Sequence, residues 1–128
     1  MKLDVVFEPT ATGWSAYPAE VSGVGVTAPD RDAARALVLG AASSHLDIPR
    51  AELELREYEV VTERAGNRYK AYLSPHVLGC WAEAASADEA QDMLAAAIQN
   101  GCLRAETANL TFYSSAAFAT SLQQRVPA

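Results

Sequence analysis

The sequence has few cysteines, few positive charges and no long apolar run. Its 128 residues include only two cysteines, Cys80 and Cys102. No stretch approaches the roughly 20 uninterrupted apolar residues of a membrane span, and residues 1–4 do not open the apolar core that a signal peptide needs. We therefore expect a cytoplasmic protein in which both thiols are reduced and form no disulfide framework.

Positive charge is scarce as well. Ten Lys and Arg stand against sixteen Asp and Glu, which gives a net charge of −6. This balance opposes attraction to a phosphate backbone, so nucleic acid is an unlikely partner on charge grounds. An acidic surface suits a basic protein partner, although net charge also serves solubility alone. Both interpretations stay open at this point.

Half of the residues are hydrophobic and 20% are charged, which is enough apolar surface for a packed core. Runs rich in β-branched and aromatic residues, bounded by turn residues, predict strands. Helices are predicted where apolar residues recur at i, i+3, i+4 and i+7. The predicted strands are 3–8, 14–17, 21–27, 53–61, 69–73, 79–84 and 109–114, and the predicted helices follow Asp30 and span 86–100.

The ends of both helices carry recognisable signals. Asp30 is the predicted N-cap of the first helix, which should end at residues 47–49 because Pro49 disfavours helical dihedrals in the residue before it. Ser86 and Glu89 have the form of a capping box, and Gly101 follows the second helix where a left-handed residue is expected. The second helix is thus the better marked of the two.

A shift of 56 positions relates the two halves of the chain. It carries Gly23 onto Gly79 and the apolar face of the first helix onto that of the second. The matched face residues are Ala34 and Ala90, Leu37 and Met93, Val38 and Leu94, Ala41 and Ala97, and Ala42 and Ile98. We therefore predict an α+β fold of two repeated β-β-β-α-β units, 1–52 and 53–114, that share the strand 53–61 and pack about a pseudo-two-fold axis. Residues 115–128 form a C-terminal tail.

No pattern of catalytic, metal-binding or cofactor-binding residues emerges. The glycines Gly23 and Gly25 fit a loose dinucleotide fingerprint, but we place them inside a strand and not in a strand-helix turn. His45 and His76 lack ligand partners at helical spacing, and Cys80 is expected to be a small buried residue. Carboxylates on neighbouring strands form either a solvated face or a Mg²⁺ pair; they are Asp4, Glu8, Glu52, Glu54 and Glu57. We favour the solvated face, and predict neither metal, nor cofactor, nor enzyme activity.

Five aromatic residues are the candidate partner-binding set. Large aromatics near hairpins pack in cores, and they are also the preferred anchors of protein interfaces. Their exposure decides between the two roles. The set comprises Trp14, Tyr17, Tyr69, Tyr72 and Trp81.

The motifs around both predicted hairpins resemble the HicB antitoxin family. In the first half these are residues 5–8, 14–18 and 22–23 with a helix start at 32–34, and in the second half the loop 71–80 and the helix start 86–90. The resemblance implies a unit similar to a stripped-down ribonuclease H fold without catalysis. Val24 stands where the family pattern has Cys, and the chain after residue 105 is too short for the family's usual DNA-binding domain.

The resemblance also implies a function. HicB-like units bind and mask a small basic HicA-like ribonuclease toxin, and many of them assemble as homo-oligomers. We therefore expect a non-catalytic protein-binding module. The alternative is a stand-alone tandem domain that binds a small ligand or a different protein in the cleft between its units, and an enzyme is the third choice.

Overall fold

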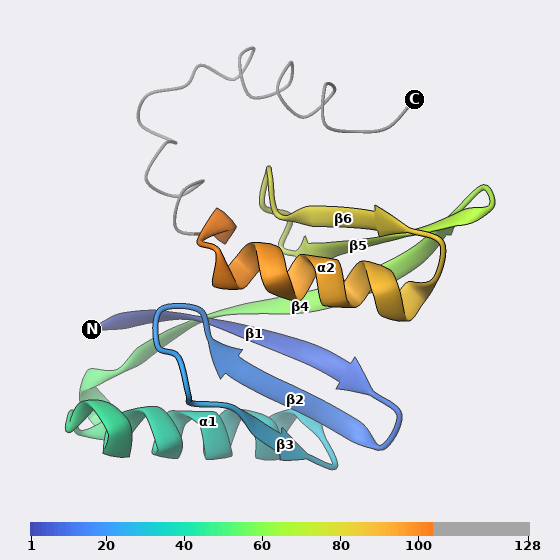
Figure 1. Ribbon diagram of the computed structural model, residues 1–128. Helices are drawn as coiled ribbons and strands as arrows, with labels where there is room; N and C mark the ends of the chain where they lie inside the picture. Colours follow the sequence, from blue (N-terminus) through green and yellow to red (C-terminus); the bar gives the residue numbers. More distant parts are fainter. Residues whose placement is uncertain (104–128) are drawn as a thin grey trace, which may run out of the picture. The chain divides into compact units, whose positions relative to one another are not determined.

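The computed structural model describes residues 1–103, and Figure 1 shows their α+β fold. Within these residues two α-helices accompany a six-stranded mixed sheet with the strand order β3-β2-β1-β4-β5-β6. The strands are β1 (Lys2–Thr10), β2 (Gly13–Pro18), β3 (Val26–Ala28), β4 (Glu54–Ala65), β5 (Arg68–Ser74) and β6 (Trp81–Ala84). The helices are α1 (Arg31–Leu46), α2 (Ala87–Gln99) and the short 3₁₀ helix η1 (Arg50–Glu52).

The predicted α+β class is confirmed. The predicted strand 109–114 and the tail 115–128 lie outside the described residues. No helix in the described part is long and apolar enough to cross a membrane.

The chain divides into two compact units, the first ending at Val61 and the second beginning at Thr62. The division falls within β4, whereas the sequence places the unit boundary between residues 52 and 53. Along the chain, three strands precede each α-helix: β1, β2 and β3 precede α1, and β4, β5 and β6 precede α2. The internal repeat and its symmetry stay predictions.

In the first unit, β1 and β2 form an antiparallel hairpin, and β1 pairs in parallel with β4 from Lys2 opposite Glu54 to Phe7 opposite Glu59. A parallel pair needs a long crossover connection, which here passes through β2, β3 and α1. Gly13 is required where β2 meets β3, because a Cβ there would overlap the carbonyl group of Ala28. The β1–β2 hairpin therefore forms the centre of the first unit's sheet, and Gly13 allows β3 to pair closely with β2.

Helix α1 begins and ends where the sequence predicts. The Asp30 carboxylate accepts a hydrogen bond from the Ala33 N–H at 2.8 Å, and Asp47 closes the helix in the left-handed region with φ 55°. The buried stripe consists of Ala34, Val38 and Ala42, which pack with Leu3, Val5 and Phe7 of β1.

The prediction that Leu37 belongs to the core face is wrong. Its side chain is 51% exposed, because it lies at the edge of a stripe that is centred on residues spaced four apart.

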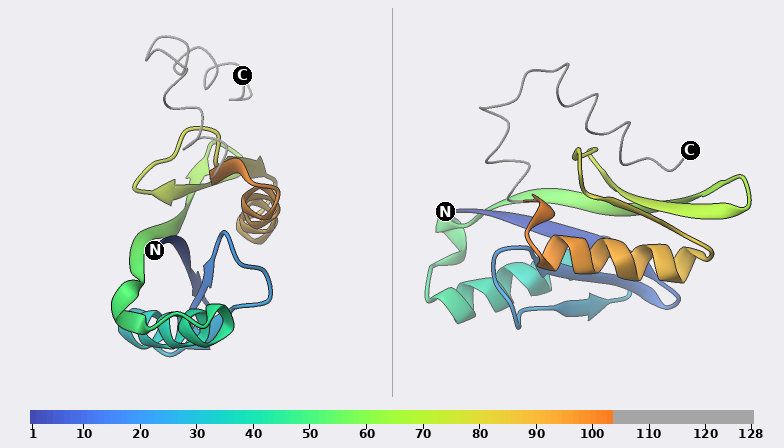
Figure 2. Two further views of the ribbon diagram at one scale, coloured as in Figure 1. Left: turned by 90° about the vertical axis from the view of Figure 1, so that its left-hand side faces the viewer. Right: turned by 45° about the horizontal axis from the view of Figure 1, so that its top comes forward.

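In the second unit, β5 and β6 pair antiparallel from Tyr69 opposite Ala84 to Tyr72 opposite Trp81. Helix α2 runs along these strands (Figure 2) and buries Ala90, Leu94 and Ile98. The Ser86 hydroxyl accepts a hydrogen bond from the Glu89 N–H at 3.2 Å, so the predicted N-cap is confirmed. Gly101, with φ 95°, follows the helix.

The prediction that Met93 belongs to the core face is also wrong. Met93 is 47% exposed. Like Leu37 in α1, it lies beside the stripe of residues spaced four apart that packs on the strands.

The expectation of two reduced cysteines is wrong as well. Cys80 and Cys102 form a disulfide, with their Cα atoms 5.6 Å apart and a sequence separation of 22. Cys80 is fully buried, as expected. The bond joins the residue that precedes β6 to a residue just beyond α2. The residues around each cysteine do not predict this bond, because only the packing of α2 on β6 brings the two cysteines together.

The position of the glycine-rich segment differs from the prediction too. Gly23 and Gly25 lie in the loop between β2 and β3, because β3 extends only from Val26 to Ala28. A Cβ added at either glycine would meet nothing within 4 Å, so these residues mark neither a close approach of strands nor a bulge. Gly23 adopts φ 82°, which favours glycine in this loop. The segment also does not lead directly into a helix, as a dinucleotide-binding turn would.

Candidate functional site

The five candidate carboxylates do not belong to any cluster of three or more possible metal ligands within the described residues. Within residues 1–103, no three side chains of His, Cys, Asp or Glu lie together as a metal would require. Two of the five predicted carboxylates are held in ion pairs instead, Asp4 with Arg56 and Glu57 with Arg31 and Arg35. Arginine pairing offsets the negative charge of both carboxylates.

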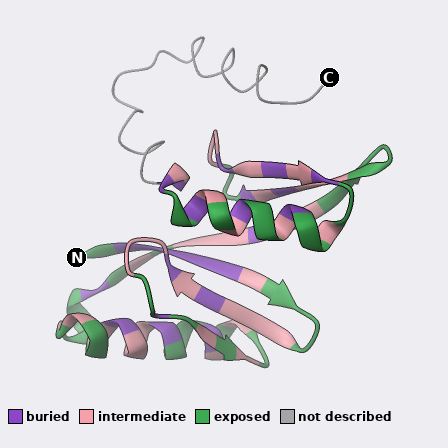
Figure 3. Cartoon of the chain, in the orientation of Figure 1, coloured by how far each residue is buried: buried purple, intermediate pink, exposed green. Residues whose placement is uncertain are grey.

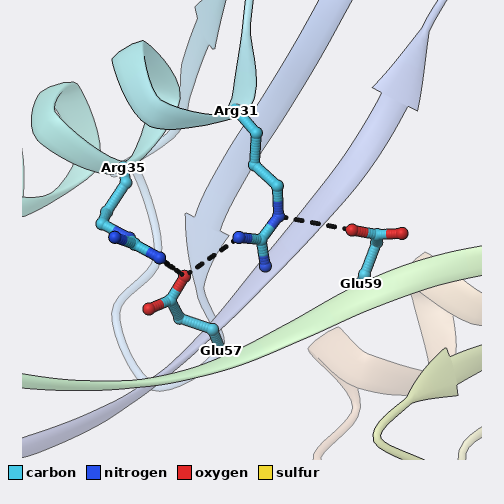
Figure 4. A network of polar contacts seen from close by, with 4 residues as sticks. All are labelled: Arg31, Arg35, Glu57 and Glu59. Carbon is cyan, nitrogen blue, oxygen red and sulfur yellow. Dashed lines mark hydrogen bonds and ion pairs between the residues drawn. The ribbon is translucent and has the colours of Figure 1, made fainter.

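Figure 4 shows the larger of these networks, which joins the first turns of α1 to β4. Glu57 Oε1 lies 2.7 Å from Arg35 Nη2 and 3.4 Å from Arg31 Nη1, and Arg31 Nε lies 3.3 Å from Glu59 Oε1. The Arg31 guanidinium also stacks over the buried Phe7 ring, 4.4 Å from its centroid. Because the groups are partly exposed, each pair contributes up to about 1 kcal/mol. The network aligns α1 on the sheet.

The buried carboxylate of Asp4 is the centre of the second network. Asp4 is 2% exposed, and its two carboxylate oxygens lie 2.8 and 3.1 Å from Arg56 Nε and Nη2. Its backbone N–H donates to both carboxylate oxygens of Glu20, at 3.0 and 3.1 Å. The Ala19 N–H donates to the Asp4 carbonyl at 2.7 Å. The Glu20 side chain thereby continues the β1–β2 ladder beyond Pro18.

This network perturbs its titratable members. Burial raises the pKa of Glu20, and the adjacent Asp4 carboxylate adds to the rise against the lowering effect of the backbone N–H bonds. Burial also raises the pKa of the Tyr58 hydroxyl, again with a contribution from Asp4. Perturbed groups of this kind occur in active sites and in structural networks alike. Here Asp4 and Glu20 link β1 to the segment that follows β2 and, through Arg56, to β4, so we assign the cluster a structural role.

The five aromatic candidates do not form one surface, because they lie in different units and on different faces of the strands. Trp14 packs against the core of the first unit. The Tyr17 hydroxyl is buried without a hydrogen-bond partner in the described structure, and burial, with a smaller effect of Glu8, raises its pKa. Tyr69 shares its face of β5 with the buried Ala71 and Leu73. These three aromatics are therefore poor anchors for a partner.

Tyr72 and Trp81 are brought together on the other face of the β5–β6 pair. They are direct cross-strand neighbours, and the Lys70 amine lies 5.9 Å from the Tyr72 ring centroid and 5.4 Å from that of Trp81. The Tyr72 hydroxyl donates to Glu63 at 3.2 Å. Two of the five candidates thus share one partly exposed platform.

A pocket of about 350 Å³ lies between β6 and α2, and we call it the β6–α2 pocket. Residues from both elements line it: Trp81, Ala82, Glu83, Met93 and Ala97. Met93 is one of the few large apolar side chains that are strongly exposed in the described structure. Sequence analysis missed this site because it assigned Met93 to the core. The sequence did hold one indication that Met93 is exposed. Met93 lies beside the stripe of apolar residues spaced four apart, Ala90, Leu94 and Ile98, and not within it.

The exposed residues of α2, green in Figure 3, include three acidic side chains. Asp88, Glu89 and Asp92 are exposed, and α2 contains no Lys or Arg. None of the three carboxylates forms an ion pair within the described chain. All three lie in the first two turns of α2, where the positive end of the helix dipole stabilises negative charge. The helix therefore accommodates them without a Lys or Arg of its own. Glu89 lies four residues before Met93 and therefore on the same side of α2, which places negative charge beside an exposed apolar side chain.

Comparison with models of known protein families finds no match, and comparisons with curated proteins and with solved structures find none either.

Proposed function

We propose that this chain is a non-catalytic protein-binding module that binds a small basic protein through α2 and β6. The observation that carries the proposal is the exposed Met93, which lines the β6–α2 pocket, on a helix with three exposed carboxylates that form no ion pair within residues 1–103. Docking surfaces commonly consist of an apolar centre within a polar rim. A partner must therefore offer an apolar anchor and surrounding positive charge.

The energetics favour such a partner. An exposed methionine adapts its shape to what it contacts, and Trp81 adds the kind of aromatic surface that dominates binding hot spots. The net charge of −6 increases the rate at which a cationic protein encounters the chain. The same charge repels acidic proteins and nucleic acids.

The HicB resemblance supports a narrower form of the proposal, in which the partner is a small basic ribonuclease toxin and binding masks its active surface. A cytoplasmic location belongs to this form, because such a toxin acts on cellular RNA. Reducing conditions in the cytoplasm would oppose the Cys80–Cys102 bond. Alkylation of free thiols in fresh cell extract would report which state the protein adopts.

The test measures the affinity of the full chain for a HicA-type toxin whose catalytic histidine has been replaced. Met93→Ser should weaken binding by about tenfold or more, the effect of losing a hot-spot contact. Joint replacement of Asp88 and Asp92 by Asn and of Glu89 by Gln should weaken binding and reduce its dependence on salt. Leu37→Ser is the matched control, because Leu37 is exposed to a similar degree on α1 and should leave affinity unchanged.

The narrower form of the proposal is wrong if the toxin fails to bind. If Leu37→Ser and Met93→Ser weaken binding equally, α2 and β6 are not the docking surface.

A further inference from the structure

Within residues 1–103, β6 is an edge strand of the sheet, and its residues also line the β6–α2 pocket. In the described structure β6 ends the strand order, with β5 on one side and no strand on the other. Three successive residues of β6, Trp81 to Glu83, line the pocket. Successive side chains of a strand point to opposite faces, and a hollow along the outer edge of the strand accounts for lining by all three residues. An edge of this kind presents unpaired backbone N–H and C=O groups.

Resting on the proposed function, we propose that the partner docks by adding an extended segment to the edge of β6. Backbone hydrogen bonds to β6 then supply part of the affinity, and alternate side chains of the segment enter the hollow beside α2. Only an extended segment satisfies a strand edge in this way.

The spacing along α2 determines which side chains the segment carries. Glu89 and Met93 are four residues apart and lie on the same side of the helix, which separates them by about 6 Å along the axis. Side chains on one face of a strand repeat about every 6.6 Å. Two side chains on the same face of the added strand can therefore reach Glu89 and Met93 together.

The chemistry of the hollow specifies both side chains. Met93, Ala97 and Ala82 offer an apolar surface, and the small alanines leave room for a branched aliphatic side chain. Glu89, one turn before Met93 on α2, is exposed and forms no ion pair within the described residues, so a Lys or Arg of the segment complements it. The segment has the pattern of a basic residue and an aliphatic residue two positions apart.

A second copy of this chain fits the edge less well than a basic partner. Pairing two β6 strands would bring two acidic α2 helices together, in molecules that each carry a net charge of −6. Like charges placed together at an interface oppose association. The basic segment meets the same carboxylates with opposite charge.

The test uses the ¹⁵N-labelled full chain and a capped peptide of sequence Thr-Lys-Thr-Leu-Thr-Thr, followed by NMR. Binding should shift the amide signals of residues 81–84 and of α2 near Met93. Two N-methylated peptides provide the decisive comparison, one methylated at Lys and Leu and the other at the alternate Thr positions. Because only one edge of the added strand pairs with β6, one methylation pattern should abolish binding and the other should leave it nearly unchanged.

Side-chain recognition is tested in parallel. Glu89→Gln should weaken binding of the Lys peptide, while a peptide with Glu in place of Lys should not bind. The matched control is Glu52→Gln, since Glu52 is an exposed carboxylate in the first unit and should have no effect.

Each other outcome overturns the inference. If both methylated peptides bind like the parent, or if no peptide binds while the toxin does, docking does not use the strand edge and only the proposed function survives. If signals of residues 81–84 shift with protein concentration alone, the occupant is a second copy. If neither peptide nor toxin binds, the proposed function fails as well.

Discussion

Breaking the Cys80–Cys102 bond should destabilise the second unit selectively. The bond closes a loop of 22 residues between the start of β6 and the end of α2. Loop-closure entropy for this length corresponds to about 3 kcal/mol at 25 °C in the chain-entropy description. Reduction isolates this contribution, because it leaves every other contact of the two side chains in place.

The two tryptophans allow each unit to be followed separately. Trp14 packs in the first unit and Trp81 directly follows Cys80 in the second. Urea unfolding should be recorded by fluorescence in a Trp14→Phe chain and in a Trp81→Phe chain, each with and without dithiothreitol. With a urea dependence of about 2 kcal/mol per molar, a loss of about 3 kcal/mol shifts the midpoint by roughly 1.5 M.

The expected shift concerns the Trp81 signal, and the Trp14 signal should move less. A Trp81 midpoint that reduction leaves unchanged would refute the reasoning. A chain with both cysteines replaced by Ala, unfolded without dithiothreitol, should match the reduced protein and serves as the control.

Two further predictions concern the Asp4 network. Arg56→Gln should lower the free energy of unfolding by about 1–3 kcal/mol, measured by urea unfolding, because it leaves the buried Asp4 carboxylate without its cation, and the partial exposure of Arg56 reduces the cost of a fully buried break. The raised pKa of Glu20 means that the folded state holds its proton more tightly than the unfolded state. This contribution is greatest below the ordinary value of 4.5 and is lost as the pH rises through the folded pKa. Stability curves recorded against pH should therefore fall less steeply above pH 4.5 in Glu20→Gln, and identical slopes would contradict the assignment.

Local sequence signals determined the elements of this protein and where most of them begin and end. Side chains at Asp30 and Ser86 cap the two helices through bonds to residues three positions on, so the signal and its partner lie within one turn of chain. The runs of β-branched and aromatic residues between turn residues likewise marked β1, β2 and β5 closely. Interactions of this short range are encoded in the order of residues alone.

Only the tertiary structure decided which face of each element is buried and which distant residues meet. Leu37 and Met93 fit an apolar stripe, yet the packing direction of each helix leaves them exposed. The Cys80–Cys102 bond and the β6–α2 pocket arise because α2 packs on β6, and nothing in the intervening residues fixes that packing by itself. Exposure and contact depend on how whole elements pack, and that packing is a property of many residues at once.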